Sequence, residues 1–357
     1  MDEKLTKNAV ELLKRLIQTP SFSKEEHETA LLIEKWLNDN GITTNRKQNN
    51  IWATNKYFDP KKPNILLNSH HDTVKPNKAY TNNPFETIEK DGKLYGLGSN
   101  DAGGCLVSLM SLFVHFYEKK DLKYNLIIAA TAEEEISGKN GIASLLDLLP
   151  PINFAVVGEP TEMQLAIAEK GLMVIDAYAP GVSGHAAHEN TENAIYNALE
   201  DIDWIRNYEF PKVSEELGKI KASVTQVNAG SQHNVVPAEC HFVIDVRVNE
   251  AYQNEEVFSI INQNTKSKMK ARSFRLNSSS IVADHPIVKA GIALGRKTYG
   301  SPTISDQALL PCPSLKLGPG KSTRSHNANE FIKLSEIKEG INLYINIFNQ
   351  ILLNATP

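Results

Sequence analysis

Several short apolar runs in this 357-residue chain end in acidic residues or histidine, and this pattern constrains the fold more than any other feature. The candidates are His70 and Asp72 after residues 65–67, Glu133, Glu134 and Glu135 after residues 126–130, and Glu159 after residues 154–157. Buried carboxylates are costly unless a cation compensates them. Ligands of open α/β sheets bind at the carboxyl ends of the strands. We therefore expect these side chains to meet at one edge of an α/β sheet.

Two further candidates lie outside such runs. Asp101 sits in a glycine-rich segment, residues 96–104, and His326 in the segment 324–327. Two imidazoles with three or more carboxylates suit a pair of divalent ions, zinc above all, with cobalt or manganese as substitutes. The sequence therefore predicts two zinc ions per chain and a metal-assisted hydrolysis.

Composition excludes several other classes of function. The net charge of -4 offers no basis for binding nucleic acid or an anionic membrane. No run of about 18 apolar residues could cross a membrane, and the first residues contain no apolar signal core. The three cysteines are far apart and odd in number. We expect a cytoplasmic enzyme without a thiolate metal cluster.

Hydrophobic periodicity divides the chain into two kinds of fold. Up to residue 170, and again from 281 to 357, strands alternate with helices, which predicts a mainly parallel sheet flanked by helices. Residues 171–280 combine alternating strands with two amphipathic helices, which predicts an inserted α+β sandwich. The expected helices cover 5–17, 102–117, 142–149, 194–208, 255–264, 286–299 and 334–353, with another opened by a capping box at Ser23 and Glu26.

Individual residues allow a functional and a structural interpretation. Asp101 could bridge two metal ions, or it could cap the following helix. His70 and Asp72 face the same side of an extended segment, so Asp72 could orient His70, or the pair could belong to a surface turn. The triplet Glu133 to Glu135 could supply one metal ligand and one free carboxylate, or it could form a solvated acidic turn.

Five motifs in order resemble one known family. The motifs are SHHDTV (69–74), GSNDAGG (98–104), TAEEE (131–135), VGEPT (157–161) and RSHNANE (324–330). They span nearly the whole chain and are similar to those of the zinc-dependent acylase, dipeptidase and desuccinylase metallopeptidases. The resemblance implies that His70 and Glu159 bind one zinc ion, that Glu135 and His326 bind the other, and that Asp101 bridges the two. It further implies that Glu134 is the general base and that Asp72 orients His70. It also implies a cis peptide bond after Asp101. Glu133, where relatives often have Asp, departs from the pattern at a position that is not a ligand.

The resemblance extends to the inserted segment, which would act as lid and dimerisation domain. His185 would reach the substrate carbonyl, from the partner subunit in a homodimer, and Asn234 and Arg247 would hold the substrate α-carboxylate. From the residues alone, Arg247 could equally be a surface arginine paired with Asp245 or Glu250.

The implied substrate is a small N-acyl amino acid of arginine biosynthesis, with N-acetylornithine as the family default. Acetylated or succinylated citrulline, succinylated ornithine, N-succinyldiaminopimelate and dipeptides are the competing substrates. A different class of function, a catalytically silent relative that only binds metal or ligand, would require the loss of a ligand or of the base. Every one of those residues is retained here.

Overall fold

The computed structural model describes residues 3–353, which divide into two compact units. The larger unit contains the residues up to Ile167, Ile281–Tyr299 and the chain from Ser305 onward. The smaller unit contains Ala168–Ser280 and Gly300–Ile304. No helix among the described residues is long and apolar enough to cross a membrane.

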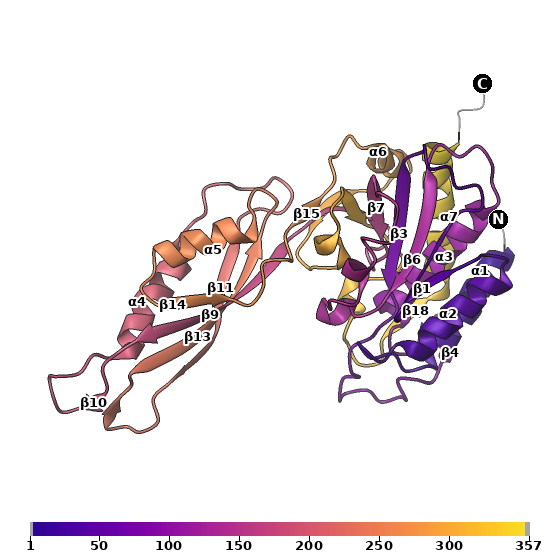
Figure 1. Ribbon diagram of the computed structural model, residues 1–357. Coiled ribbons are helices and arrows are strands. Elements are labelled where there is room, and N and C mark those ends of the chain that lie inside the picture. Colours follow the sequence, from indigo (N-terminus) through magenta and orange to yellow (C-terminus); the bar gives the residue numbers. More distant parts are fainter. Residues whose placement is uncertain (1–2, 354–357) are drawn as a thin grey trace. The chain divides into compact units, whose positions relative to one another are not determined.

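A mainly parallel sheet forms the centre of the larger unit, as the sequence predicts (Figure 1). Its strands β6, β3, β7 and β17 are parallel neighbours, while β1, β2 and β8 join antiparallel at the sides. In spatial order the strands are β1 (Asn45–Lys47), β2 (Asn50–Thr54), β6 (Asn125–Thr131), β3 (Asn64–His70), β7 (Phe154–Val157), β17 (Ser314–Lys316) and β8 (Leu165–Glu169).

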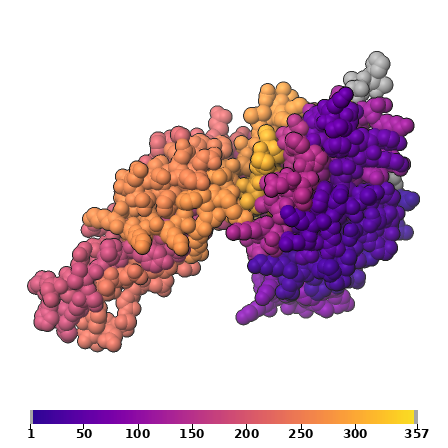
Figure 2. Space-filling view, in the orientation of Figure 1, coloured from indigo at the N-terminus to yellow at the C-terminus, as the bar shows by residue number. Residues whose placement is uncertain are grey.

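Helices gather on one face of this sheet. Ile65 and Leu67 of β3 pack into the helix-covered core, and Leu66 points to a second apolar cluster on the other face. Successive strand residues face opposite sides, so an unbroken apolar run requires that both faces be covered. The helices are α1 (Glu3–Ile17), α2 (His27–Asp39), α3 (Gly104–Tyr117), α6 (Pro286–Ala293) and α7 (Leu334–Leu352). The indigo surface in Figure 2 belongs to the N-terminal part of the larger unit, which contains α1 and α2.

Three helix predictions are wrong in detail. The capping box is absent: α2 begins at His27, and the Ser23 hydroxyl donates to Asp72 instead. The helix expected over 142–149 is a 3₁₀ turn, Ile142–Ser144, followed by further turns that cover the second face of the sheet. The helix expected over 286–299 ends at Ala293, near a left-handed Gly295 that turns the chain toward strand β16 (Thr298–Ser301).

The smaller unit is an antiparallel sheet with two helices on one face. Buried side chains alternate along the strands and meet α4 (Ala194–Asn207) and α5 (Asn254–Gln263). The sheet order is β11 (Lys221–Ala229), β13 (Glu239–Val248), β9 (Gly171–Pro180) and β14 (Lys268–Ala271).

The remaining short strands of the two units are β4 (Ile88–Lys90), β5 (Lys93–Tyr95), β10 (Gly184–His185), β12 (Val235–Val236), β15 (Ser279–Ser280) and β18 (Phe331–Lys333).

Candidate metal centre

The carboxyl ends of neighbouring parallel strands deliver the candidate residues to one edge of the sheet. β3 ends at His70, and the chain reaches Glu159 two residues after the end of β7. The acidic triplet begins two residues after the end of β6. Asp101 comes from a turn, Ser99–Gly103, that precedes α3, and His326 from the segment before β18. The convergence expected from the sequence is present.

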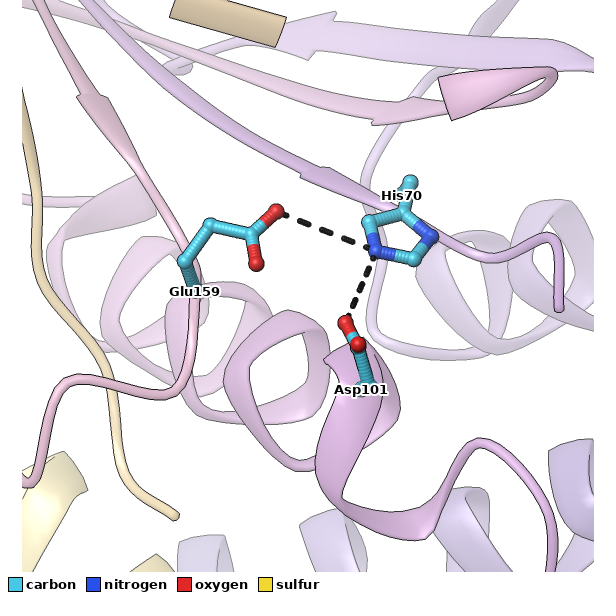
Figure 3. A group of neighbouring side chains, drawn as sticks. All are labelled: His70, Asp101 and Glu159. Atoms are coloured by element: carbon cyan, nitrogen blue, oxygen red, sulfur yellow. Dashed lines mark ion pairs between the residues drawn. The ribbon is translucent and has the colours of Figure 1, made fainter. Parts of the chain in front are cut away.

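The side chains form two groups that share Asp101. In the first group, His70 Nε2 lies 3.4 Å from Asp101 Oδ1 and 3.8 Å from Glu159 Oε1 (Figure 3). In the second, His326 Nε2 lies 3.1 Å from Glu135 Oε2 and 3.6 Å from Asp101 Oδ2. The potential ligand atoms of each group all lie within 4.8 Å of one another. Asp101 therefore turns one carboxylate oxygen toward each group.

Asp101 does not cap the helix that follows it. α3 begins at Gly104, and Gly103 occupies its N-cap position. Asp101 itself has a non-helical backbone, with φ -115 and ψ 100, and the Asp101–Ala102 bond is cis, as the resemblance implies. The turn thus directs the Asp101 side chain toward the strand ends, as Figure 3 shows.

His70 carries an orphaned nitrogen that fits a metal ion. Its side chain is only 1% exposed, and its Nδ1 lies 3.0 Å from the backbone oxygen of Asp72. A carbonyl oxygen can only accept, so Nδ1 carries a hydrogen, and the neutral form of the ring would offer a lone pair on Nε2. Among the described residues Nε2 has no hydrogen-bond partner, although it faces Asp101 and Glu159. A buried lone pair aimed at carboxylates is the arrangement of a histidine ligand.

Asp72 anchors the acidic turn as well as contacting His70. Its fully buried carboxylate accepts the N–H groups of Glu134 at 3.0 Å and Glu135 at 3.2 Å, and the hydroxyl of Ser23 at 2.7 Å. Its distance to His70 Nδ1 is 3.4 Å, longer than the bond that its own backbone oxygen makes. The sequence did not indicate this contact with the turn, nor the part played by Ser23.

The three glutamates of the turn separate in space. Glu133 adopts a left-handed backbone with φ 56 and accepts a hydrogen bond from the side chain of Asn140 at 2.9 Å. Glu135 pairs with His326, and Glu134 Oε2 lies 3.9 Å from His70 Nε2. Burial, together with the nearby charge of Glu159, raises the pKa of Glu134 well above its usual range. Glu135 thus belongs to a ligand group and Glu134 lies beside the ligand groups, while the Glu133 side chain is bonded to Asn140.

The crowding of charge supports the presence of cations. Burial and the neighbouring Asp101 raise the pKa of Glu159 to about 8. The hydrogen bond with Glu135 raises the pKa of His326 to about 9. Burial and repulsion by Asp101 favour the protonated form of Glu159, and the attraction of Glu135 favours that of His326. Divalent ions relieve the same repulsion, and imidazole with carboxylate oxygen is a donor set that zinc accepts.

The three candidates of the smaller unit occupy two places in it. His185 lies in β10, exposed to solvent, and pairs with Val235, next to Asn234. Arg247 lies on the helix-free face of β13, where its Nε donates to Asp245 at 2.8 Å. The pairing with Asp245 considered for Arg247 is therefore present.

Sequence reasoning assigned no definite role to two buried acids of the larger unit, although residues 305–306 resemble a loop that lines the pocket in the family. Asp306 accepts hydrogen bonds from Asn68 and Thr131, each at 2.8 Å, and burial raises its pKa to about 6. Glu330 binds the backbone around Asp101. The only signal for Glu330 was its place in the RSHNANE motif, four residues after His326.

A family model described as "Peptidase family M20/M25/M40" matches residues 66–350. The chain belongs to this family. It is accordingly a metallohydrolase of the M20 type, and the catalytically silent alternative receives no support from this match.

Curated relatives of this M20 chain include two amidohydrolases. One is a succinyl-diaminopimelate desuccinylase from Rickettsia bellii (strain RML369-C), 25% identical over 96% of each chain. Another is an acetylornithine deacetylase from Proteus mirabilis (strain HI4320), 29% identical over 92% of this chain and 93% of the relative.

Solved structures share the fold of the M20 chain. The metallo-carboxypeptidase Sso-CP2 from Sulfolobus solfataricus matches with a TM-score of 0.75 at 15% identity, over 98% of this chain and 99% of that one. YXEP from Bacillus subtilis, described as a dinuclear metal binding peptidase, matches with a TM-score of 0.72 at 17% identity, over 97% and 98%.

Replacing His326 with alanine should remove one of two metal ions per chain and leave the other. The reason is that His326 belongs only to the second group, whereas His70 and Glu159 belong only to the first. Metal analysis of the purified variant measures the stoichiometry, and circular dichroism verifies that the fold is retained. Two ions per chain in the folded variant would show that His326 is not a ligand.

Proposed function

We propose that this M20 chain is a two-zinc deacylase that hydrolyses the amide bond of N-acetylornithine in arginine biosynthesis. The observation that carries the proposal is the pair of ligand groups sharing Asp101, with the buried carboxylate of Glu134 beside them. The choice of substrate is supported by the 29% identity to the Proteus mirabilis acetylornithine deacetylase.

In this proposal His70 and Glu159 hold one zinc, Glu135 and His326 hold the other, and Asp101 binds both. Bound zinc ions would polarise the acyl carbonyl and lower the pKa of water toward neutrality. Asp72 holds the backbone of the turn that carries Glu134 and Glu135, so it keeps a ligand and the base at a constant separation.

Glu134 acts as the general base and then as the general acid. Its carboxylate takes the proton of the attacking water and delivers it to the amine nitrogen as the carbon–nitrogen bond breaks. An amide nitrogen leaves readily only after protonation, and in this proposal Glu134 delivers the proton that it took from the water.

The smaller unit supplies the groups that bind the substrate. Arg247 provides a planar donor pair for the α-carboxylate, with Asn234 as a further donor. His185 donates to the carbonyl oxygen as negative charge develops on it. The exposed position of His185 in the short strand β10 is consistent with a group that closes onto substrate.

The length of β13 supports a homodimer. Asn234 and His185 lie beyond the Glu239 end of β13, while Arg247 lies near its other end. Eight residues of strand span about 26 Å, which exceeds the length of an acylated amino acid. Arg247 of one chain is therefore too far from His185 and Asn234 of the same chain for them to hold one substrate molecule together, whereas His185 and Asn234 of a second copy could complete the site.

Apolar side chains on the smaller unit favour the same assembly. Tyr196 and Leu199 of α4 are 67% and 54% exposed, and Val227 lies exposed on β11, at one edge of the sheet. An open edge strand with apolar neighbours is suited to pairing with another chain.

The free cysteines of the described chain support a reducing compartment such as the cytoplasm.

A second candidate substrate is N-succinyldiaminopimelate. The observation that favours it is the match to the Rickettsia bellii desuccinylase over 96% of each chain. Both reactions hydrolyse an amide bond. The two substrates differ in the acyl group that is released and in the group at the far end of the amino-acid side chain.

A hydrolysis screen distinguishes these substrates. Acetyl and succinyl donors are each paired with ornithine, citrulline and diaminopimelate, and the released amine is measured with the zinc-loaded protein. We expect the highest kcat/KM with N-acetylornithine. A higher value for any succinylated amino acid would overturn the assignment of the substrate while leaving the amidohydrolase chemistry intact.

Glu134→Gln should lower kcat by at least about 10²–10⁴, the value of general acid–base catalysis, while both metal ions stay bound. Glu133→Gln is the matched control, since Glu133 is adjacent in sequence but bonded to Asn140. It should retain activity close to that of the parent protein. If the effects of the two variants were reversed, Glu133 would be the base.

His185→Ala should lower kcat by about 10²–10³, the usual loss for one oxyanion donor, with both zinc ions retained. His188→Ala, whose ring lies 5.6 Å from that of His185, is the control and should be nearly neutral. Mixing His185→Ala chains with Glu134→Gln chains should restore activity in the mixed dimers, because one site then has both residues intact. No recovery in a confirmed mixed dimer would show that His185 does not act across subunits.

A further inference from the structure

Glu330 is a buried acid of the larger unit that the chemistry above does not use. It is 2% exposed and lies four residues after His326, immediately before β18. It belongs to neither ligand group. Burial, together with the neighbouring Asp101, raises the pKa of Glu330 to about 8.

Backbone amides of the Asp101 segment surround the Glu330 carboxylate. Oε1 accepts the N–H groups of Asn100 at 2.8 Å and Asp101 at 2.9 Å, and Oε2 accepts that of Gly98 at 3.3 Å. The backbone oxygen of Glu330 accepts a fourth N–H, from Gly96, at 3.0 Å. One residue thus satisfies four donors in a segment of six residues.

The Asp101 segment cannot satisfy these donors itself. Asp101 and Ala102 have non-helical backbone angles, which interrupts the repeating hydrogen bonds that a helix would provide. A buried N–H without a partner is costly, and a carboxylate is a strong acceptor for several at once. The orientation of the peptide groups on either side of Asp101 sets the direction of its side chain. Glu330 accepts hydrogen bonds from the N–H groups of Asn100 and Asp101 in this part of the backbone.

The same contacts join two loops that carry ligands. Asn100 adds a second connection, since its Oδ1 accepts the N–H of Lys321 at 2.9 Å and its Nδ2 donates to the oxygen of Lys321 at 3.1 Å. Residues 96–101 are therefore bound to residues 321–330 on both sides of His326. His326, whose Nε2 lies 3.6 Å from Asp101 Oδ2, is thus placed between two connections to the Asp101 segment.

We propose that Glu330 is a positioning residue of the metal centre, which sets the shared ligand Asp101 relative to His326. The inference rests on the proposed function only in requiring that the two groups bind metal ions. Glu330 touches neither metal nor substrate in this role. It acts through the backbone of Asn100 and Asp101.

Glutamine is not equivalent to glutamate at this position. Both carboxylate oxygens of Glu330 accept backbone donors, and glutamine would place an amide N–H₂ against at least one of them. One accepted bond would then become a contact between two donors. The size of the side chain stays the same, so the change tests the hydrogen bonds rather than the packing.

Asp201 of the smaller unit offers a matched control. It is 3% exposed and its carboxylate accepts the N–H groups of Lys266 at 2.9 Å and Ser267 at 2.8 Å. Asp201→Asn therefore removes the same kind of interaction, a buried carboxylate bonded to backbone amides, in a unit that holds no candidate metal ligand.

The test is titration of metal-free parent, Glu330→Gln and Asp201→Asn proteins with Co²⁺, followed by calorimetry and visible absorption. We expect Glu330→Gln to bind Co²⁺ about 10–100-fold more weakly, the usual effect of losing an outer partner of a ligand, with an altered spectrum of the bound ion. Asp201→Asn should bind with the affinity and spectrum of the parent. Thermal melts of the three metal-free proteins measure the loss of stability in both variants.

Two results would overturn the proposal: parental Co²⁺ affinity and spectrum in Glu330→Gln, or an equal loss of affinity in Asp201→Asn. A parent protein that binds no Co²⁺ would instead refute the metal centre. If Glu330→Gln does not fold, amide hydrogen exchange of the parent decides the matter. The amides of Gly98, Asn100 and Asp101 should be strongly protected, and rapid exchange there would contradict the role of Glu330.

Discussion

Repulsion between carboxylates at one edge of a buried sheet is the constraint on which the larger unit depends. Asp101 and Glu159 come from separate segments, Glu134 and Glu135 come from one turn, and burial removes the water that would screen these carboxylates. Protons or cations can compensate this charge. Compensation by a proton is reflected in the pKa of Glu159, which is raised to about 8. Metal ions provide the second kind of compensation, because a ligand must lose its proton when it binds a metal.

Backbone amides provide the fixed part of this balance. Asp72 and Glu330 are themselves buried acids, and both accept N–H groups of the segments that carry the candidate ligands. These backbone dipoles favour the ionised form of each carboxyl group and cannot diffuse away. The hydrogen bonds of Asp72 and Glu330 to backbone amides leave the four inner carboxylates as the candidates for binding an ion.

Local sequence predicted those features whose causes are local. His70 and Glu159 were found because strand ends are visible as breaks in apolar runs. Ser23 was misassigned because its partner Asp72 lies 49 residues away, and a capping pattern contains no information about such a contact. Glu330 was missed for the same reason, since the amides that it binds lie about 230 residues earlier. The short turns after Ile142 mimic helical spacing because they too cover a sheet face.

The register of β3 has a consequence for how such a chain can change in length. His70 pairs with Thr131, and each residue of β3 back to Asn64 has a fixed partner on β6. Adding one residue within β3 would turn every later side chain to the opposite face, His70 included. The segments that enter β3 and β6 at Asn64 and Asn125 carry no ligand. Tags, insertions or new chain ends are therefore best introduced at that opposite edge of the sheet, where an added loop leaves the ligand positions undisturbed.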